Sequence, residues 1–140
     1  MRKKYNSTPK NPKVGEKYDI RRDYQGNLLE YTTYEYNDEG TKYKINHKAV
    51  YDANNRKIAY YDSNGTFSNY EYNSNGELVY EVNGSVRTGI STEHWYDNNK
   101  EIFRRRVDAD TMQVREHRND VQVAEYYNPF IRIYCNPLYR

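Results

Sequence analysis

The sequence predicts an all-β fold, an antiparallel β-hairpin meander of about eight to ten short strands with a flexible basic N-terminal arm. Three observations support it: turn-forming tetrads recur, apolar and polar residues alternate between them, and 18 of the 140 residues are tyrosine. Leu, Ile, Val and Phe contribute only 23 residues, about 16%. Because tyrosine buries a large ring and keeps its hydroxyl in contact with water, a tyrosine-rich chain with a net charge of only +2 can still form a thin core.

The N-terminal segment, residues 1–17, is predicted to be the flexible basic arm. It holds six basic side chains, one acidic side chain, Pro9, Pro12 and Gly15, and almost no apolar residues. A solubilising tail is the simplest interpretation of this composition. The alternative is contact with nucleic acid or another acidic surface, since cationic segments attract polyanions.

Six tetrads that begin with Asp or Asn recur from residue 23 to residue 100, and Tyr precedes five of them. A type I turn favours these residues first, because the side chain accepts a hydrogen bond from the backbone N–H two residues on. The fourth position then adopts a left-handed conformation, which Gly adopts freely and Asn tolerates. This is the three-residue hairpin loop with a glycine bulge. The predicted turn-defining residues are Gly26, Gly40, Asn55, Gly65, Gly76 and, in the shorter turn 82–85, Gly84.

The last tetrad, 97–100, ends in Lys100 and so breaks the pattern. A turn on Asn98 and Asn99 is the alternative there.

Alternation between the turns predicts strands. The contrast is clearest in 41–51, where one face carries Tyr43, Ile45, His47 and Ala49 and the other carries lysines and Asn46, as in a half-buried strand with a solvated back. Strands are predicted with less contrast at 28–36, 56–61, 66–72, 77–82, 86–96 and 101–107. Together they make residues 18–107 a β-hairpin repeat domain in which each strand pairs with its neighbours in sequence.

The C-terminal segment, residues 108–140, is predicted to form strands packed on the same domain. Met112 and Val114 alternate with polar residues, as do Val121 and Val123, so strands are favoured over a helical turn at 111–118. Four apolar residues near the end are expected to anchor the C-terminus to the sheet: Phe130, Ile131, Ile133 and Tyr134.

Three of the tetrads resemble a known repeat. Residues 51–56 (YDANNR), 61–66 (YDSNGT) and 72–78 (YNSNGEL) are similar to the Tyr-Asp (YD, or RHS-type) repeats of bacterial surface and toxin-delivery proteins. The resemblance covers roughly residues 18–103 and implies arrays of β-hairpins to which carbohydrate or partner binding has been ascribed. The repeat arrays of this family are hundreds of residues long and belong to very large secreted proteins, so the delivery function is not carried over to this chain.

The sequence predicts no catalytic set, cofactor or metal site, and therefore not an enzyme. His47, His94 and His117 lie far apart, and neither they nor Cys135 stand at zinc-ligand spacing. Cys135 is expected to pack as a small apolar residue. The segment 62–65 is similar to part of a calcium loop, but its Gly comes too early and no distal Glu follows.

The aromatic side chains outnumber what one face of a small sheet needs, which points to a binding surface. Tyrosine and tryptophan offer a large contact area at low entropic cost. The predicted partner-binding residues are Tyr60, Tyr70, Tyr72, Tyr80, Trp95, Arg104 and Arg106, the two arginines sharing one face of a strand. The alternative is that the tyrosines form stabilising cross-strand ladders and that the arginines lie on a solvated edge.

We therefore expect a non-enzymatic protein that binds a protein partner through a tyrosine-rich sheet, as a bacterial or phage assembly component, an inhibitor or an immunity-type protein. Self-association is also expected, because a sheet poor in aliphatic residues gains from covering a face. A carbohydrate-binding module is the alternative, and nucleic-acid contact through the arm is the third hypothesis. The chain shows no signal peptide and no apolar run long enough for a membrane span, so a cytoplasmic or virion-associated location is expected.

Overall fold

A computed structural model describes residues 4–130 of the chain, and side chains from residue 6 onward. The described residues divide into two compact units, one ending at Asn64 and one beginning at Gly65. Both units are all-β, which confirms the predicted fold class, and neither contains a helix within residues 4–130. The predicted boundaries at residues 17 and 107 rest on composition and remain predictions.

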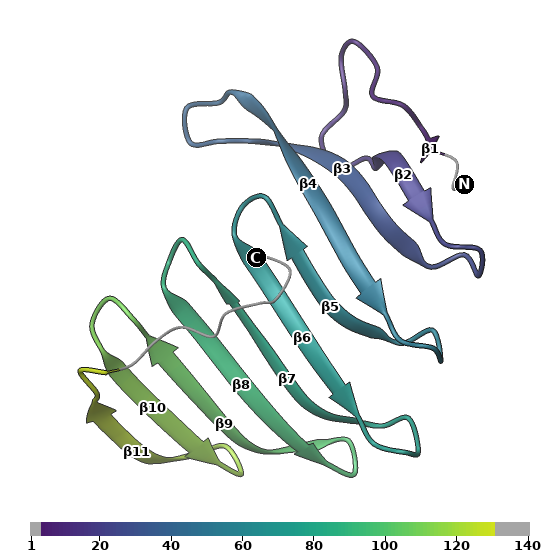
Figure 1. Cartoon of the computed structure of the whole chain (residues 1–140). Coiled ribbons are helices and arrows are strands. Elements are labelled where there is room, and N and C mark those ends of the chain that lie inside the picture. Colours follow the sequence, from purple (N-terminus) through teal and green to yellow (C-terminus); the bar gives the residue numbers. More distant parts are fainter. Residues whose placement is uncertain (1–3, 131–140) are drawn as a thin grey trace. The chain divides into compact units, whose positions relative to one another are not determined.

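The first unit is an antiparallel sheet in which each strand pairs with the next one in sequence (Figure 1). Its strands are β1 (Lys4–Tyr5), β2 (Tyr18–Arg22), β3 (Leu28–Tyr36), β4 (Lys42–Tyr51) and β5 (Lys57–Asp62). The alternation predicted for 41–51 is confirmed by burial. Ile45 and Ala49 are 3% and 8% exposed, whereas the intervening Lys44, Asn46 and Lys48 are exposed.

The second unit repeats the same arrangement with six strands. They are β6 (Thr66–Tyr72), β7 (Leu78–Ser85), β8 (Ile90–Asp97), β9 (Lys100–Asp108), β10 (Gln113–Arg118) and β11 (Val121–Tyr127). Four of its most buried residues lie in one row across five strands, and Val82, 0% exposed, lies on the same face two residues from Gly84. In this row Phe67 lies opposite Gly84, Ser91 is opposite Val107, and Val107 is opposite Val114. All of these but Gly84 are 7% exposed or less, so this row is the core of the unit.

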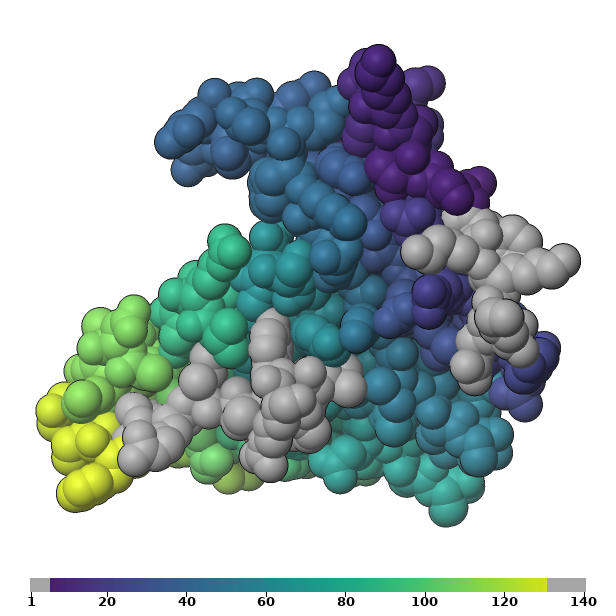
Figure 2. Space-filling view, turned by 45° about the horizontal axis from the view of Figure 1, so that its top comes forward, coloured from purple at the N-terminus to yellow at the C-terminus, as the bar shows by residue number. Residues whose placement is uncertain are grey.

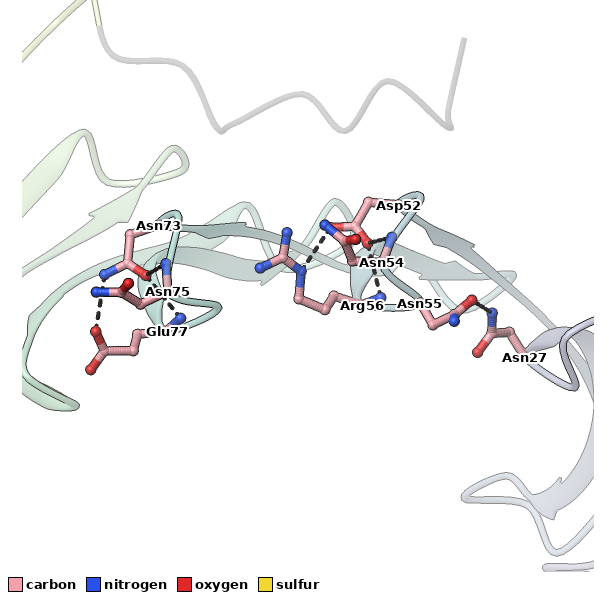
Figure 3. A network of polar contacts seen from close by, with 8 residues as sticks. All are labelled: Asn27, Asp52, Asn54, Asn55, Arg56, Asn73, Asn75 and Glu77. Carbon is pink, nitrogen blue, oxygen red and sulfur yellow. Dashed lines mark hydrogen bonds and ion pairs between the residues drawn. The ribbon is translucent and has the colours of Figure 1, made fainter.

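Four predicted turns have the predicted geometry. In each turn, Oδ1 of the first residue accepts two backbone hydrogen bonds. One comes from the N–H two residues later, at 2.9–3.0 Å, and the other from the N–H four residues later, at 2.8–3.0 Å. Figure 3 shows this for the turns that begin at Asp52 and at Asn73. The fourth residues have positive φ: 91° at Gly26, 76° at Gly40, 63° at Asn55 and 81° at Gly76. Gly65 also has a positive φ, 91°.

Neighbouring turns at the same end of a unit are joined by hydrogen bonds. In the first unit, Asn27 Nδ2 donates to Asn55 Oδ1 at 2.9 Å, which connects the β2–β3 turn to the β4–β5 turn (Figure 3). In the second unit, Ala109 N donates to Gly89 O at 2.8 Å. The repeated tetrads thus connect hairpins laterally as well as reversing the chain.

The prediction that Gly84 defines a turn is wrong. Gly84 lies inside β7, opposite Phe67 of β6, and a Cβ built on it would stand 2.5 Å from the carbonyl oxygen of Ile90. A cross-strand pair of this kind covers a glycine with an aromatic ring. The chain reverses five residues later, where Gly89 has a φ of 72° and its backbone N–H donates to Ser85 O. As a result β7 is longer than predicted and β8 begins at residue 90, not 86.

Two of the remaining hairpins turn on pairs of residues with positive φ. Asn98 and Asn99 have φ of 51° and 63° between the paired Asp97 and Lys100, which confirms the alternative for that tetrad. Asn119 and Asp120 connect β10 to β11 in the same way. The C-terminal segment is therefore strand and not helix up to residue 127. Phe130 is 87% exposed and so is not an anchor, and Ile131, Ile133, Tyr134 and Cys135 lie outside the described residues.

The described part of the basic arm contacts the first unit. β1 pairs with β2, the side chain of Asp19 accepts hydrogen bonds from Thr8, and Gly15 N donates to Tyr34 O at 3.3 Å. Lys42 of β4 donates to the carbonyl oxygen of Pro12 at 2.6 Å. Its predicted flexibility remains a prediction, but the segment from residue 6 to residue 15 is bonded to β2, β3 and β4.

Candidate functional site

The predicted partner-binding residues do not form one surface. Tyr60 belongs to the first unit, where its hydroxyl donates to Asp62 at 2.8 Å and lies 2.6 Å from Nδ1 of His47. Its polar end is therefore engaged within the unit. The other six residues belong to the second unit, where the strand register divides five of them between the two faces of the sheet.

One face of the second unit carries Tyr80 and Trp95. Tyr80 of β7 lies directly opposite Trp95 of β8, which lies opposite Phe103 of β9, and residues opposite one another share a face. The other face carries Tyr70, Arg104 and Arg106, because Tyr70 aligns through Glu81 and His94 with Arg104. Tyr72 ends β6 where the register shifts.

The first of these faces holds a row of three aromatic rings. The Tyr80 and Trp95 rings meet edge to face, with centroids 5.3 Å apart and planes at 60°. Trp95 and Phe103 are also 5.3 Å apart, tilted by 54°. All three side chains are half-buried. They stabilise one another through favourable ring geometry and still present surface to a partner.

Two arginines lie over these rings. The guanidinium of Arg105 is 5.6 Å from the Trp95 centroid and 5.7 Å from that of Phe103. Arg118 of β10 approaches Phe103 to 5.1 Å. Such cation–π contacts keep the cations on the aromatic surface. We call Tyr80, Trp95, Phe103, Arg105 and Arg118 the aromatic–arginine face.

Two carboxylates fix the position of Arg105. Its Nε lies 2.7 Å from Glu116 Oε2, and its Nη1 lies 3.7 Å from Glu93 Oε1. Glu93 also accepts a hydrogen bond of 2.6 Å from the hydroxyl of Tyr80. The hydrogen bond that Arg105 donates to Glu116 raises the pKa of Arg105 above its already high usual value. The guanidinium is therefore held as a permanent cation between two anions, in an orientation set before any partner arrives.

The opposite face of the second unit carries the predicted pair Arg104 and Arg106. They do share a face, but Arg104 forms ion pairs with Glu101 at 3.3 Å and with Asp120 at 2.9 Å. Arg106 lies opposite Arg115 of β10, and Arg115 is paired with Glu125. Tyr96, at the end of β8, donates to Glu81, and burial together with that carboxylate raises the pKa of Tyr96.

Phe103, Arg105 and Glu93 belong to the site although they were not among the predicted binding residues. A signal for two of them was present in the sequence, because Phe103 and Arg105 are two residues apart and so share a strand face. The position of Trp95 between them required the register of β8 against β9, including its shift near Tyr96.

The first unit holds a second group of polar side chains. Arg21, Glu30, Lys44 and Lys48 line a cavity of about 300 Å³, and Glu30 lies 3.6 Å from both Arg21 and Lys48. The ion pairs of Glu30 are long and the side chains that form them are 37–53% exposed, so each pair stabilises the unit only weakly.

Residues 4–130 contain no cluster of three or more His, Cys, Asp or Glu side chains suited to a metal ion. In the same residues no helix is long and apolar enough to cross a membrane. Asp62, which begins the calcium-like segment 62–65, accepts a hydrogen bond of 2.9 Å through Oδ1 from the backbone N–H of Asn64 and one of 2.8 Å through Oδ2 from the hydroxyl of Tyr60.

Comparison with known proteins adds no family to this description. No protein-family model matches the chain, and no curated protein is significantly similar to it.

Proposed function

We propose that this protein is a non-enzymatic interaction protein that binds a protein partner through the aromatic–arginine face of its second unit. The observation that carries the proposal is the row of Tyr80, Trp95 and Phe103 with Arg105 and Arg118 laid over it. Tryptophan, tyrosine and arginine are the residues most enriched at the energetic centres of protein interfaces. A role as an assembly component, an inhibitor or an immunity-type protein fits such a surface.

The geometry favours a protein over a carbohydrate. A sugar ring stacks on an aromatic ring whose face is open, whereas Arg105 stands over both Trp95 and Phe103. The rings are also tilted against one another and do not form one flat platform. The guanidinium of Arg105, held between Glu93 and Glu116, instead adds a fixed planar group to the rings, in the composition typical of the centres of protein interfaces. Carbohydrate binding remains the alternative proposal.

Nucleic-acid contact has less support. It would use the basic arm of residues 1–17 together with Arg104 and Arg106, and the side chain of Arg104 is engaged by two carboxylates. The neutralisation of phosphates needs cations that are not already paired.

The proposal is tested by affinity capture from candidate host lysates with quantitative mass spectrometry, using two matched charge reversals. Arg118→Glu alters the aromatic–arginine face, and Arg106→Glu alters the opposite face of the same sheet. We expect a stoichiometric protein that is recovered with the wild type and with Arg106→Glu, and lost by roughly tenfold or more with Arg118→Glu. Circular dichroism and thermal melting establish that both variants are folded.

The binding itself is measured with the purified partner through the fluorescence of Trp95, the single tryptophan of the chain. Equal capture by the two variants would place the interface elsewhere and contradict the proposal. A glycan array run with the same proteins separates the alternative: glycan binding that disappears with Arg118→Glu, without a protein partner, would support a carbohydrate-binding module.

A further inference from the structure

The strand β11 is a sheet edge with an unusual amount of exposed apolar surface. Among residues 4–130 it pairs with β10 and with no other strand. Its two valines and two tyrosines are 42–64% exposed: Val121, Val123, Tyr126 and Tyr127. An exposed apolar edge strand is a template for pairing with another strand.

This edge has little of the protection that sheet edges usually carry. It contains a register shift opposite Glu116 and His117, but residues 121–127 include no lysine and no proline. The one charged residue, Glu125, is paired with Arg115 at 3.4 Å. By contrast, β1 is two residues long and includes a lysine, which are two common means of blocking an edge.

The backbone groups of β11 that point away from β10 can be identified from those that bond toward β10. Asn128 N donates to Met112 O at 2.8 Å, so the backbone groups of Asn128 point toward the β10 side. In an antiparallel pair, alternate residues direct their N–H and C=O to opposite sides. Glu125 and Tyr127 therefore direct theirs away from β10, where a further strand would bind.

We propose that the occupant of this edge is the β11 strand of a second copy of the chain, paired antiparallel across a two-fold axis at Ala124. This register sets Val121 opposite Tyr127, Gln122 opposite Tyr126, and Val123, the extra residue at the β10–β11 bulge, opposite Glu125. A β-branched residue opposite an aromatic one is a favourable cross-strand pair, and no two like charges face each other. A register centred one residue later would place Glu125 opposite itself.

The edge adjoins the face assigned above to a protein partner, since the hydroxyl of Tyr126 donates a hydrogen bond of 3.3 Å to Glu116, which pairs with Arg105. In the space-filling view the yellow residues that include β11 lie at the surface (Figure 2). The dimer would be isologous, with the same strand contributed by both copies.

The test uses the full chain and two substitutions at one position. Val123→Glu places a second carboxylate opposite Glu125 of the other copy, twice in the symmetric dimer, whereas Val123→Lys places an ammonium there. Analytical ultracentrifugation and light scattering should give twice the 16.9 kDa chain mass for the wild type at high concentration. We expect the dimer dissociation constant to be roughly tenfold higher for Val123→Glu than for Val123→Lys, since like charges directly opposite destabilise a strand pair.

Hydrogen exchange provides the second measurement. The amides of Glu125 and Tyr127 should become protected as the chain concentration rises, while that of Asn128, already bonded to Met112, stays protected at every concentration. Equal association of two folded variants would overturn the proposal, as would a wild type that is monomeric throughout. Protection of Glu125 and Tyr127 in the monomer would also overturn it, because another segment of the chain would then occupy the edge.

Discussion

Tyr31 and His47 stack across β3 and β4 with ring centroids 4.2 Å apart and planes only 6° from parallel. The imidazole is held at both nitrogens: Nδ1 lies 2.6 Å from the hydroxyl of Tyr60, and Nε2 lies 2.7 Å from that of Thr33. Because the single hydroxyl proton of Tyr60 is donated to Asp62, Nδ1 must carry the proton that it shares with Tyr60. In the neutral ring, Nε2 is then the acceptor for the hydroxyl of Thr33.

This arrangement predicts that acid weakens the first unit through His47. Burial lowers the pKa of His47 from its usual 6.5, although Asp62 opposes the shift. Below pH 6.5 the unfolded chain binds the proton more readily than the folded chain, so the free energy of unfolding falls as the pH falls through this range. The titration of the His47 ring, followed by NMR, should have its midpoint below 6.5.

The variant His47→Gln tests the stability side of the same prediction. Between neutral pH and the pH at which the wild-type His47 ring is half protonated, the free energy of unfolding should change less in this variant than in the wild type. A wild-type midpoint at or above 6.5 would contradict the assignment of a neutral, buried ring.

A second prediction concerns the left-handed turn residue Gly40. A side chain there meets nothing within 4 Å, so any cost of substitution comes from its φ of 76°. Gly40→Val should lose about 1–2 kcal/mol of stability, the cost of a left-handed conformation for a residue with a Cβ. Gly40→Asn should lose less, because Asn55 adopts a φ of 63° at the equivalent place. Urea unfolding of the two variants compares them directly, and equal midpoints would count against the bulged turn.

Gly84 should be sensitive for a different reason. Its Cβ would lie 2.5 Å from Ile90 O and 2.8 Å from Ser91 Cα, and these backbone atoms cannot move without disturbing the β7–β8 ladder. We expect Gly84→Ala to destabilise the protein by about 1–3 kcal/mol, as overpacking does elsewhere. Gly40→Ala, where space is free but φ is 76°, measures separately the cost of a left-handed conformation without crowding. A Gly84→Ala variant as stable as the wild type would show that β7 and β8 are not so closely spaced.

The contrast between these two glycines shows how far the sequence predicts the fold. The turns at Asp52 and Asn73 were predictable because their hydrogen bonds join residues two and four places apart. Gly84 was not predictable from its neighbours, since Asn83–Gly84 is also a good turn sequence. What decides its role is Phe67, which lies opposite it on another strand.

The candidate site shows the same limit. Alternation predicted correctly that Arg104 and Arg106 share a face, but which face bears Trp95 depends on the register between β8 and β9. The residue between those two arginines, Arg105, is the one that meets the tryptophan. Such pairings depend on long-range contacts and not on local composition.

Arg105 should stabilise the second unit as well as shape its surface. Arg105→Met removes the cation from Trp95 and leaves Glu93 and Glu116, whose side chains are 24% and 16% exposed, without their shared partner. The variant should lose roughly 1–2 kcal/mol and shift the emission of Trp95. Adding Glu116→Gln should recover part of the loss, because it removes one unpaired charge. Strictly additive losses in this double-mutant cycle would contradict a direct interaction.

The turn at Asp52 predicts a separate response to strong acid. Hydrogen bonds from the backbone N–H groups of Arg56 and Asn54, with the Arg56 side chain, lower the pKa of Asp52 below its usual 3.8, against a smaller effect of burial. The folded carboxylate therefore stabilises the turn above pH 3.8, and this contribution is lost as the pH falls below that value.

Asp52→Asn should keep the two backbone hydrogen bonds, since Asn37 and Asn73 accept the same pair in their turns. Its free energy of unfolding should consequently fall less between neutral pH and pH 3 than that of the wild type. Chemical denaturation at the two pH values measures this difference, and an identical fall in both proteins would show that the carboxylate of Asp52 contributes nothing as an anion.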